Sequence, residues 1–273
     1  MFEICYNASR HVKKLSVYII AKNEAARIRR TLEAVRPVAD ELIVVDSGST
    51  DSTVEIAKEI ADKVVFHEWV SFADQKHYAE RLCAYDWVMM DDADEVVSPQ
   101  LREEVAAWKE RDDQPPFLYR FHIASIYPGE SKPPRFGHAY DEIRLYHRRH
   151  GGMRAEDLTD DRVHADDGET IGRFKASVWH YSYISLEQVV TKLNRYTTEE
   201  LEKNRRRNRH FSILRLFTEM PLSFIRYYFL RRLFAHGLTG FIIAVNASYF
   251  RWLRIAKDYE MRHFTSGAEV RFS

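Results

Sequence analysis

Four runs of apolar residues in the first third of the chain have the length and composition of buried β-strands. Each is nearly continuous in hydrophobicity and rich in Val, Ile or Met, which is typical of strands that are covered on both faces. The four runs are Leu15–Ala21, Glu41–Asp46, Lys63–His67 and Asp86–Met90.

Segments of helical character separate these runs. We expect helices from Asn23 to about Val35, from Asp51 to Ala61 and from Ser71 to Cys83. Polar residues that can cap a helix stand at each start, namely Asn23, then Ser49 or Thr50, then Ser71 paired with Asp74. Alternating strands and helices with short connections predict an α/β fold, with a mostly parallel sheet and helices on both faces.

The second half of the chain extends the sheet and then becomes helical. Ser98 and Pro99 begin a short helix. Further strands are expected at 117–127, 142–147 and 173–183, with a Pro- and Gly-rich loop at 128–137 and an acidic loop at 151–169. A capping box at Ser185–Gln188 begins a helix that reaches about Arg206, and two more helices, broken near Gly237 and Gly240, fill 211–259.

The fourth strand ends in a cluster of acids, Asp91, Asp92, Asp94 and Glu95. Ligands of open α/β sheets bind at the carboxyl ends of the strands, and Asp46 ends the second strand at the same edge. Two carboxylates one residue apart, such as Asp92 and Asp94, can share a hard cation if the chain turns between them, which the small Ala93 permits. The alternative is a solvated acidic turn, because Asp-rich strand ends are common.

Composition narrows the class of protein. The 273 residues are 45% hydrophobic with a formal net charge of zero, which favours a globular protein and argues against a general nucleic-acid binder. The two cysteines do not suggest a disulfide framework. Residues 1–14 lack the apolar core of a signal peptide, so we expect a cytoplasmic protein.

Three stretches, in their order and spacing, resemble family 2 glycosyltransferases, which have the GT-A fold. They are Val17–Glu24 (VYIIAKNE), Val44–Thr53 (VVDSGSTDST) and Asp92–Glu95 (DADE). Trp179–Tyr183 (WHYSY) and Lys192–Tyr196 (KLNRY) are similar to the branch that includes lipopolysaccharide inner-core β-1,4-glucosyltransferases. The resemblance implies a GT-A catalytic domain over residues 1–184 and a basic, amphipathic helical region over residues 185–273.

The resemblance also implies an inverting transfer of a hexose from a UDP-sugar to a lipid-linked saccharide, with Mg²⁺ or Mn²⁺ as cofactor. Glucose is the first candidate for the hexose. In the family the last acid of D-x-D is the main metal contact, so Asp94 is the stronger ligand and Asp92 faces ribose and metal. Ala21, Asn23 and Glu24 correspond to the nucleotide-binding loop, although helix capping alone could explain them.

Three further positions keep two interpretations each. Asp46 can accept hydrogen bonds from uracil or ribose, or can cap an Asx-type turn. His180 is a metal or diphosphate contact, or a satisfied core histidine. Arg144 resembles the family's Arg-Leu element and can hold a phosphate or orient an acid, or is a surface cation.

The catalytic base is the point at which the chain departs from the family pattern. An inverting transfer needs a carboxylate that takes the proton of the acceptor hydroxyl. The family places an acid directly after Val-His, whereas this chain has Ala165 there, followed by Asp166 and Asp167. Asp166 is the first candidate and Asp167 the second. Ala165 leaves open a slow or inactive enzyme, or a non-catalytic binding protein derived from a glycosyltransferase; another polysaccharide or polyprenyl-phosphate acceptor is the remaining alternative.

Charge is uneven along the chain. Between Leu201 and Lys257 the only acids are Glu202 and Glu219, among many Arg and Lys residues, which indicates an anionic partner. A helix with an apolar face and such a basic border can lie on an anionic bilayer. We therefore expect a peripheral protein on the inner face of the cytoplasmic membrane; the alternative is a helical cap packed on the catalytic domain.

Overall fold

The computed structural model describes residues 12–112, 114–127, 129–154, 160–181, 185–206 and 210–264. The chain divides into two compact units. The first is built from Met1–Ser125 and Ala139–Tyr181, and the second from Ile126–His138 and Ser182–Ser273. The division that we predict after residue 184 stays a proposal for the domain limits.

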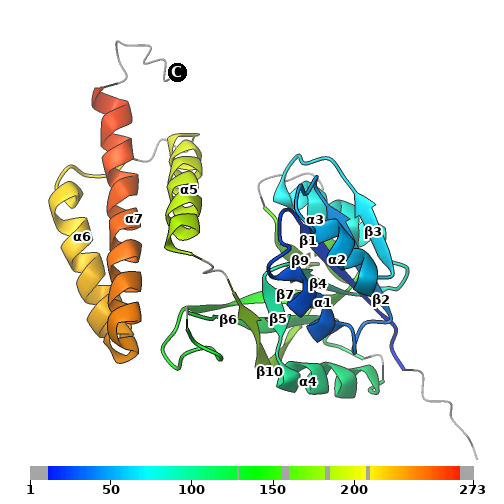
Figure 1. Cartoon of the computed structure of the whole chain (residues 1–273). Helices are drawn as coiled ribbons and strands as arrows, with labels where there is room; N and C mark the ends of the chain where they lie inside the picture. The colour runs from blue at the N-terminus through cyan, green and yellow to red at the C-terminus, as the bar shows by residue number, and fades with distance from the viewer. Residues whose placement is uncertain are drawn as a thin grey trace, which may run out of the picture. The chain divides into compact units, whose positions relative to one another are not determined.

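The first unit contains an eight-stranded mixed sheet, visible in Figure 1 in blue to green. The strand order is β3-β2-β1-β4-β7-β6-β10-β5, and a separate two-stranded sheet joins β8 to β9. The strands are β1 (Leu15–Ala21), β2 (Glu41–Asp46), β3 (Lys63–Phe66), β4 (Trp87–Asp92), β5 (Glu95–Val97), β6 (Leu118–Ser125), β7 (Ala139–His147), β8 (Gly151–Met153), β9 (Val163–Ala165) and β10 (Ile171–His180).

Helices cover both faces of this sheet because side chains alternate along each strand. Val17 and Ile19 of β1 belong to one apolar core with Leu32 of α1 (Ile28–Val35). That core also includes side chains of α2 (Thr53–Ile60) and α4 (Pro99–Lys109). Tyr18 faces the other way, into a second core with Ala79 of α3 (Phe72–Arg81). The predicted GT-A arrangement, a mostly parallel sheet with helices on both faces, is confirmed.

The start of the first helix differs from the prediction. Asn23 has a left-handed backbone, with φ of 56°, and α1 begins at Ile28 with no side-chain cap. The side chain of Asn23 instead accepts a hydrogen bond from the amide of Thr50 at 2.8 Å. The residue is used to join two loops, so helix capping does not explain it.

The second helix also differs from the prediction, because α2 begins at Thr53 after Ser52 with no side-chain cap, so neither Ser49 nor Thr50 caps it. Two other helix starts agree with their local signals. Ser71 accepts a hydrogen bond from the Asp74 amide at the start of α3. Ser98 does the same with Leu101, and Pro99 is the first residue of α4. The region expected to be an acidic loop contains the two short strands β8 and β9. They pair antiparallel, with Gly151 opposite Ala165 and Met153 opposite Val163.

The second unit is helical. Its elements are α5 (Leu186–Arg206), α6 (Arg215–Ile225), the π-helix η1 (Arg226–Leu230), the 3₁₀ helix η2 (Leu233–His236) and α7 (Gly237–His263). Both α5 and α6 contact α7, and the three lie side by side in Figure 1.

The break between α6 and α7 comes earlier than predicted. Arg232 has a left-handed backbone, with φ of 58°, and Gly237 opens α7. Gly240 lies inside α7, where a Cβ would stand 1.9 Å from the carbonyl oxygen of Leu233. Its role is therefore a close backbone approach, and the helix continues through it.

Candidate active site

The acidic cluster lies where β4 ends and the chain turns into β5. Strand register places Asp92 beside Ile20 and Asp46 beside Ala21, so the ends of β1, β2 and β4 form one edge. The turn is fixed from two sides, because Thr31 of α1 donates to the carbonyl oxygen of Ala93 at 3.0 Å and the Tyr181 amide donates to that of Asp94 at 2.8 Å. The turn that the D-x-D interpretation requires is therefore present.

Asp92 is held between two cations of the first unit. Its Oδ2 lies 3.0 Å from Nη2 of Arg144, and its Oδ1 lies 3.5 Å from Nζ of Lys76. Burial alone would raise the pKa of this carboxyl group, but the positive charges of Lys76 and Arg144 hold it below its usual range. Asp92 is consequently an ionised acid, as a ligand of a sugar hydroxyl or a cation must be.

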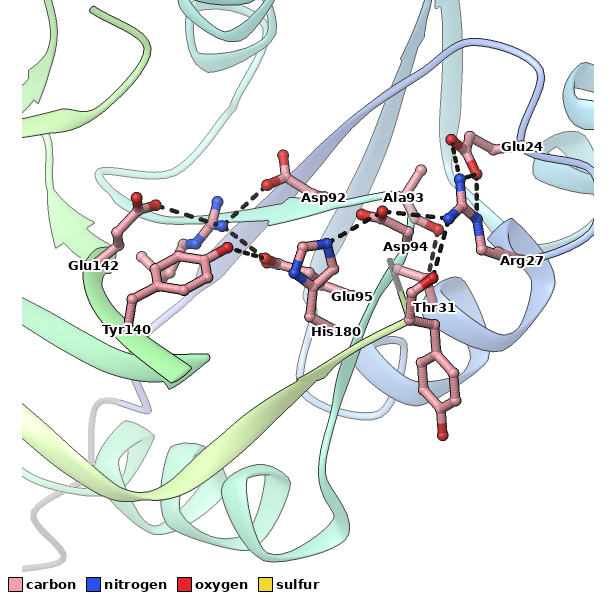
Figure 2. A network of polar contacts seen from close by, with 12 residues as sticks. Glu24, Arg27, Thr31, Asp92, Ala93, Asp94, Glu95, Tyr140, Glu142 and His180 are labelled. Atoms are coloured by element: carbon pink, nitrogen blue, oxygen red, sulfur yellow. Dashed lines mark hydrogen bonds and ion pairs between the residues drawn. The ribbon is translucent and has the colours of Figure 1, made fainter. Parts of the chain in front are cut away.

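Asp94 points to a different pair of groups, as Figure 2 shows. Its Oδ2 lies 3.2 Å from Nε2 of His180 and 3.4 Å from Nη1 of Arg27. Burial opposes ionisation, yet His180 and Arg27 lower the pKa of Asp94. Burial likewise disfavours charge on His180, but Asp94 raises the pKa of the imidazole above its ordinary value.

His180 is not a satisfied core histidine. Its Nδ1 is buried and has no hydrogen-bond partner among the described residues, while Nε2 faces Asp94. The ring stands at the end of β10, paired in register with Glu95. An imidazole directed at an acid of D-x-D suits a ligand or diphosphate contact, and that role stays a prediction.

Arg144 is buried, with 1% of the residue exposed, so it is not a surface cation. Its Nη2 lies 2.9 Å from Glu95 and 3.6 Å from Glu142, in addition to Asp92. Burial raises the pKa of Glu95, and the charge of Arg144 opposes that rise. Of the interpretations considered, these contacts support the orientation of acids.

The loops after β1 and β2 are joined to each other. The amide of Asn23 donates to Oγ of Ser49 at 2.8 Å, which complements the bond from Thr50 to the Asn23 side chain. Asp46 Oδ2 accepts from the amides of Gly48 and Ser49 at 2.8 and 2.9 Å. Asp46 therefore does cap its own turn, which also fixes its carboxylate at the sheet edge.

The two remaining residues of the predicted nucleotide loop are engaged within the protein. Ala21 is buried, and its carbonyl oxygen accepts from the Ser47 amide at 3.0 Å. Glu24 binds Arg27 through two hydrogen bonds of 2.6 and 2.7 Å. Arg27 thus connects Glu24 to Asp94, so the loop and the D-x-D are one polar network.

The structure does not bring Asp166 and Asp167 to this network. Both are exposed in the turn after β9, and the Asp166 amide donates to the carbonyl oxygen of His150. The His150 amide in turn bonds the carbonyl of His147, which pairs with Trp87 at the first residue of β4. Asp92 lies at the other end of that strand. The assignment of the base to either acid stays a prediction, without support from their position.

Three residues of the network were not predicted from the sequence: Arg27, Lys76 and Asp161. Lys76 lies on the buried face of α3, three residues after Ala73 and three before Ala79. A lysine at such a position is a readable sign of an internal anion, because a buried ammonium group needs one. Arg27 stands in a turn before α1 and Asp161 stands before the short strand β9, where no periodicity marks them.

The donor atoms fit a hard divalent cation. No group of three or more His, Cys, Asp or Glu side chains is placed to hold a metal within the described residues. Mg²⁺ needs no such cage, because in nucleotide enzymes one or two carboxylates and the substrate phosphates hold it. Two ionised carboxylates at the sheet edge, Asp92 and Asp94, meet that requirement.

Comparison with known proteins agrees with this site. Residues 16–173 match the profile of the family described as Glycosyl transferase family 2. An uncharacterized glycosyltransferase of Rickettsia typhi is 36% identical over 257 residues, which are 92% of this chain and 88% of that protein. The lipopolysaccharide core biosynthesis glycosyltransferase LpsC of Rhizobium meliloti is 27% identical, over 91% of this chain and 93% of its own.

Similarity to a solved structure is weaker. The crystal structure of S. aureus TarS 1-349 is 15% identical, with a TM-score of 0.42, over 95% of this chain and 94% of that one. The assignment therefore rests on the sequence matches, which cover more than half of the chain. This chain belongs to glycosyltransferase family 2.

Proposed function

We propose that this glycosyltransferase moves a hexose, with glucose as the first candidate, from a UDP-sugar to a lipid-linked saccharide such as a lipopolysaccharide inner core. The observation that carries the proposal is the pair of ionised acids, Asp92 and Asp94, at the strand edge beside the Asn23–Thr50 loop contact. Similarity to a lipopolysaccharide core glycosyltransferase along almost the whole chain supports the acceptor class.

In this proposal each part of the edge has one task. Asp46 and the loop of Ala21, Asn23 and Glu24 receive the nucleoside. Asp92, fixed by Arg144, would receive the ribose and, with Asp94, would hold the cation, and His180 would contact the cation or the diphosphate. Mg²⁺ or Mn²⁺ held there would act as a Lewis acid that stabilises the charge of the leaving diphosphate.

The reaction is proposed to be a single inverting displacement. The acceptor oxygen forms a bond to the anomeric carbon as the bond to the diphosphate oxygen breaks, and that electron pair leaves with UDP. A base takes the acceptor proton. The product from an α-linked donor is then β-linked, and NMR of the product anomer tests this; an α-linked product would contradict it.

Donor and metal are tested together. We expect UDP-hexoses to raise the melting temperature in the presence of Mn²⁺ more than other nucleotide sugars do, and EDTA to abolish turnover. Full turnover in excess EDTA would exclude the metal. If only sugars linked to another nucleotide raise the melting temperature, that nucleotide class takes the place of UDP in the proposal.

A second candidate is a non-catalytic binding protein derived from this family. It is favoured by Ala165 at the expected position of the base and by the distance along β4 between Asp166 and the D-x-D. Release of UDP from a UDP-sugar that disappears in Asp94→Ala would decide against it.

A membrane surface is the proposed place of action, and the second unit supports it. The contact between α6 and α7 contains a buried polar cluster as well as the ring contact of Phe224 with Phe241. In that cluster Glu219, buried in α6, lies 2.7 Å from Arg215 and 2.8 Å from Arg251 of α7. Several large apolar side chains of the second unit point outward, with Phe217, Leu230 and Leu238 exposed at 75%, 76% and 74%.

Large apolar side chains exposed beside exposed arginines suit contact with an apolar phase that has an anionic border. Among the described residues, Leu233–His263 is also long and apolar enough to cross a bilayer. We propose that the pair instead lies in the interface on the cytoplasmic face, with Arg226, Arg231 and Arg232 at anionic headgroups.

Flotation with liposomes tests this. Binding to anionic liposomes at low salt, weaker at high salt, is expected. Failure to float at low salt, or equal binding to neutral liposomes, would assign the basic helices to the fold or to the acceptor. The remaining alternative acceptors, another polysaccharide or a polyprenyl phosphate, are distinguished by supplying each to the enzyme with UDP-[¹⁴C]glucose.

A further inference from the structure

A buried lysine joins the D-x-D to a second acid that neither the motifs nor the family pattern marks. Nζ of Lys76 lies 3.5 Å from Oδ1 of Asp92 and 3.0 Å from Oδ2 of Asp161. It also approaches the carbonyl oxygen of Asp161 at 3.5 Å. One ammonium group therefore holds the donor-binding acid and the side chain and backbone of Asp161 together.

Lys76 is well fixed for this role. The residue is 4% exposed and lies between Ala73 and Ala79 on the buried face of α3. A buried ammonium group requires anionic partners, and Asp92 and Asp161 are the two acids that Nζ of Lys76 contacts among the described residues. The three groups therefore form one unit.

Asp161 is more accessible than the adjacent acid, Asp160. Its side chain is 46% exposed. Asp160 is instead occupied, because both of its oxygens bond the Arg162 guanidinium at 2.9 Å and one lies 3.2 Å from His164. The strand β9 lies between Asp161 and Asp166. Asp161 is near Asp92 at the end of β4, whereas Asp166 is near the first residue of β4.

We propose that Asp161 is the catalytic base of the transfer and that Lys76 is the positioning residue that fixes it beside the donor. The inference rests on the proposed function. An exposed carboxylate tethered beside the acid that receives the donor can meet an acceptor hydroxyl directed at the anomeric carbon. It replaces the acid that the family pattern would supply at Ala165.

The proton balance of the step is simple. The acceptor hydroxyl transfers its proton to a carboxylate oxygen of Asp161 while its oxygen bonds to the anomeric carbon. The bond from that carbon to the diphosphate breaks, and UDP leaves with the electron pair. The ammonium group of Lys76 keeps Asp161 in place and takes no proton in the step.

The test uses UDP-glucose as the probe and water as the acceptor, with UDP release as the rate and calorimetric titration as the donor affinity. Asp161→Asn should lower kcat by about 10²–10⁴-fold, the range for a lost general base, with the affinity for UDP-glucose and Mn²⁺ unchanged. Asp160→Asn is the matched control, adjacent in the chain but turned to Arg162, and should keep the wild-type kcat.

Two further measurements separate catalysis from support of the fold. Sodium formate should restore part of the activity of Asp161→Ala, because a small carboxylate can occupy the vacated position, whereas it would not repair a displaced loop. Lys76→Met should lower kcat, and the double variant with Asp161→Asn should lose less than the product of the two single losses, because part of the effect of Lys76 acts through Asp161.

The outcomes are distinct. A wild-type kcat in Asp161→Asn, or a loss of activity in Asp166→Asn or Asp167→Asn of the same size, overturns the base assignment. Losses that multiply in the double variant overturn the role of Lys76. If the wild-type protein neither binds nor cleaves any UDP-sugar, the proposed function itself is wrong and the inference falls with it.

Discussion

The two units of this protein treat buried charge in opposite ways. In the first, apolar side chains fill both faces of the sheet, and the buried ionisable residues Arg144, Asp91, Glu95 and Lys76 gather beside Asp92 at one edge. In the second, Glu219 and Asp258 are buried between helices, while Phe217, Leu230 and Leu238 point outward.

This difference in the placement of polar and apolar side chains corresponds to the function that we propose for each unit. Charge concentrated at one sheet edge is expensive to bury and is typical of a reactive site. Charge spread along a helix contact, with apolar residues outside, is typical of helices whose surroundings are not water. Buried polarity in the first unit marks the candidate active site, whereas in the second unit the exposed apolar residues motivate the proposed membrane contact, and four experiments test that distinction.

The largest effect is expected from Asp94→Asn. The substitution keeps the shape of the side chain but removes the charge that faces His180 and Arg27. We expect kcat with UDP-glucose to fall by about 10²–10³-fold, as when a preorganised electrostatic group is lost, with little change in the urea midpoint. A large loss of stability with unchanged kcat would mean that the acids at this sheet edge support the fold and not the reaction. The first unit would then not differ from the second in the role of its polar residues.

Arg144→Leu should be the most destabilising change. It leaves Glu95 buried without its cation, which costs about 3–5 kcal/mol when one partner of a buried ion pair is removed. Urea unfolding measures this. The matched control is Arg149→Leu, whose side chain is 76% exposed beside Asp86 and should cost about 0–1 kcal/mol.

Phe217→Ser and Leu230→Ser test the outer face of the second unit. Each should weaken partitioning to anionic liposomes about 10–100-fold, since burying such a side chain is worth about 1.5–3 kcal/mol. Leu186→Ser is the control, an exposed leucine of α5, which belongs to neither α6 nor α7. A different result would be that both serine variants partition as the wild-type protein does, while the wild-type protein is less soluble than they are. That result would indicate a protein partner on this face and not a bilayer.

The smallest effect concerns helix starts. Ser98→Ala removes the cap of α4 in the first unit and should cost about 1 kcal/mol. Ser212→Ala, before α6, should cost nothing measurable, because α6 has no side-chain cap. A cost at Ser212 equal to that at Ser98 would show that α6 begins as an ordinary water-exposed helix does.

Local signals along the chain were sufficient for the sheet and most of its helices. Continuous apolar runs fixed β1, β2 and β4, and caps at Ser71 and Ser98 fixed α3 and α4, because these features depend on near neighbours only. The parallel order placed Asp46 and Asp92 at one edge without knowledge of any contact.

What the sequence determined by itself is thus the architecture, the family and the D-x-D, all of which are written in short segments. Tertiary structure alone decided that Arg27 reaches Asp94, that Lys76 joins Asp92 to Asp161, and that Asp166 stands at the far end of the sheet. Those pairings join residues far apart in the chain, and no local periodicity records them. The same holds for α6 and α7, whose composition suggested a basic amphipathic surface, whereas their packing turns the charges of Glu219 and Arg251 inward.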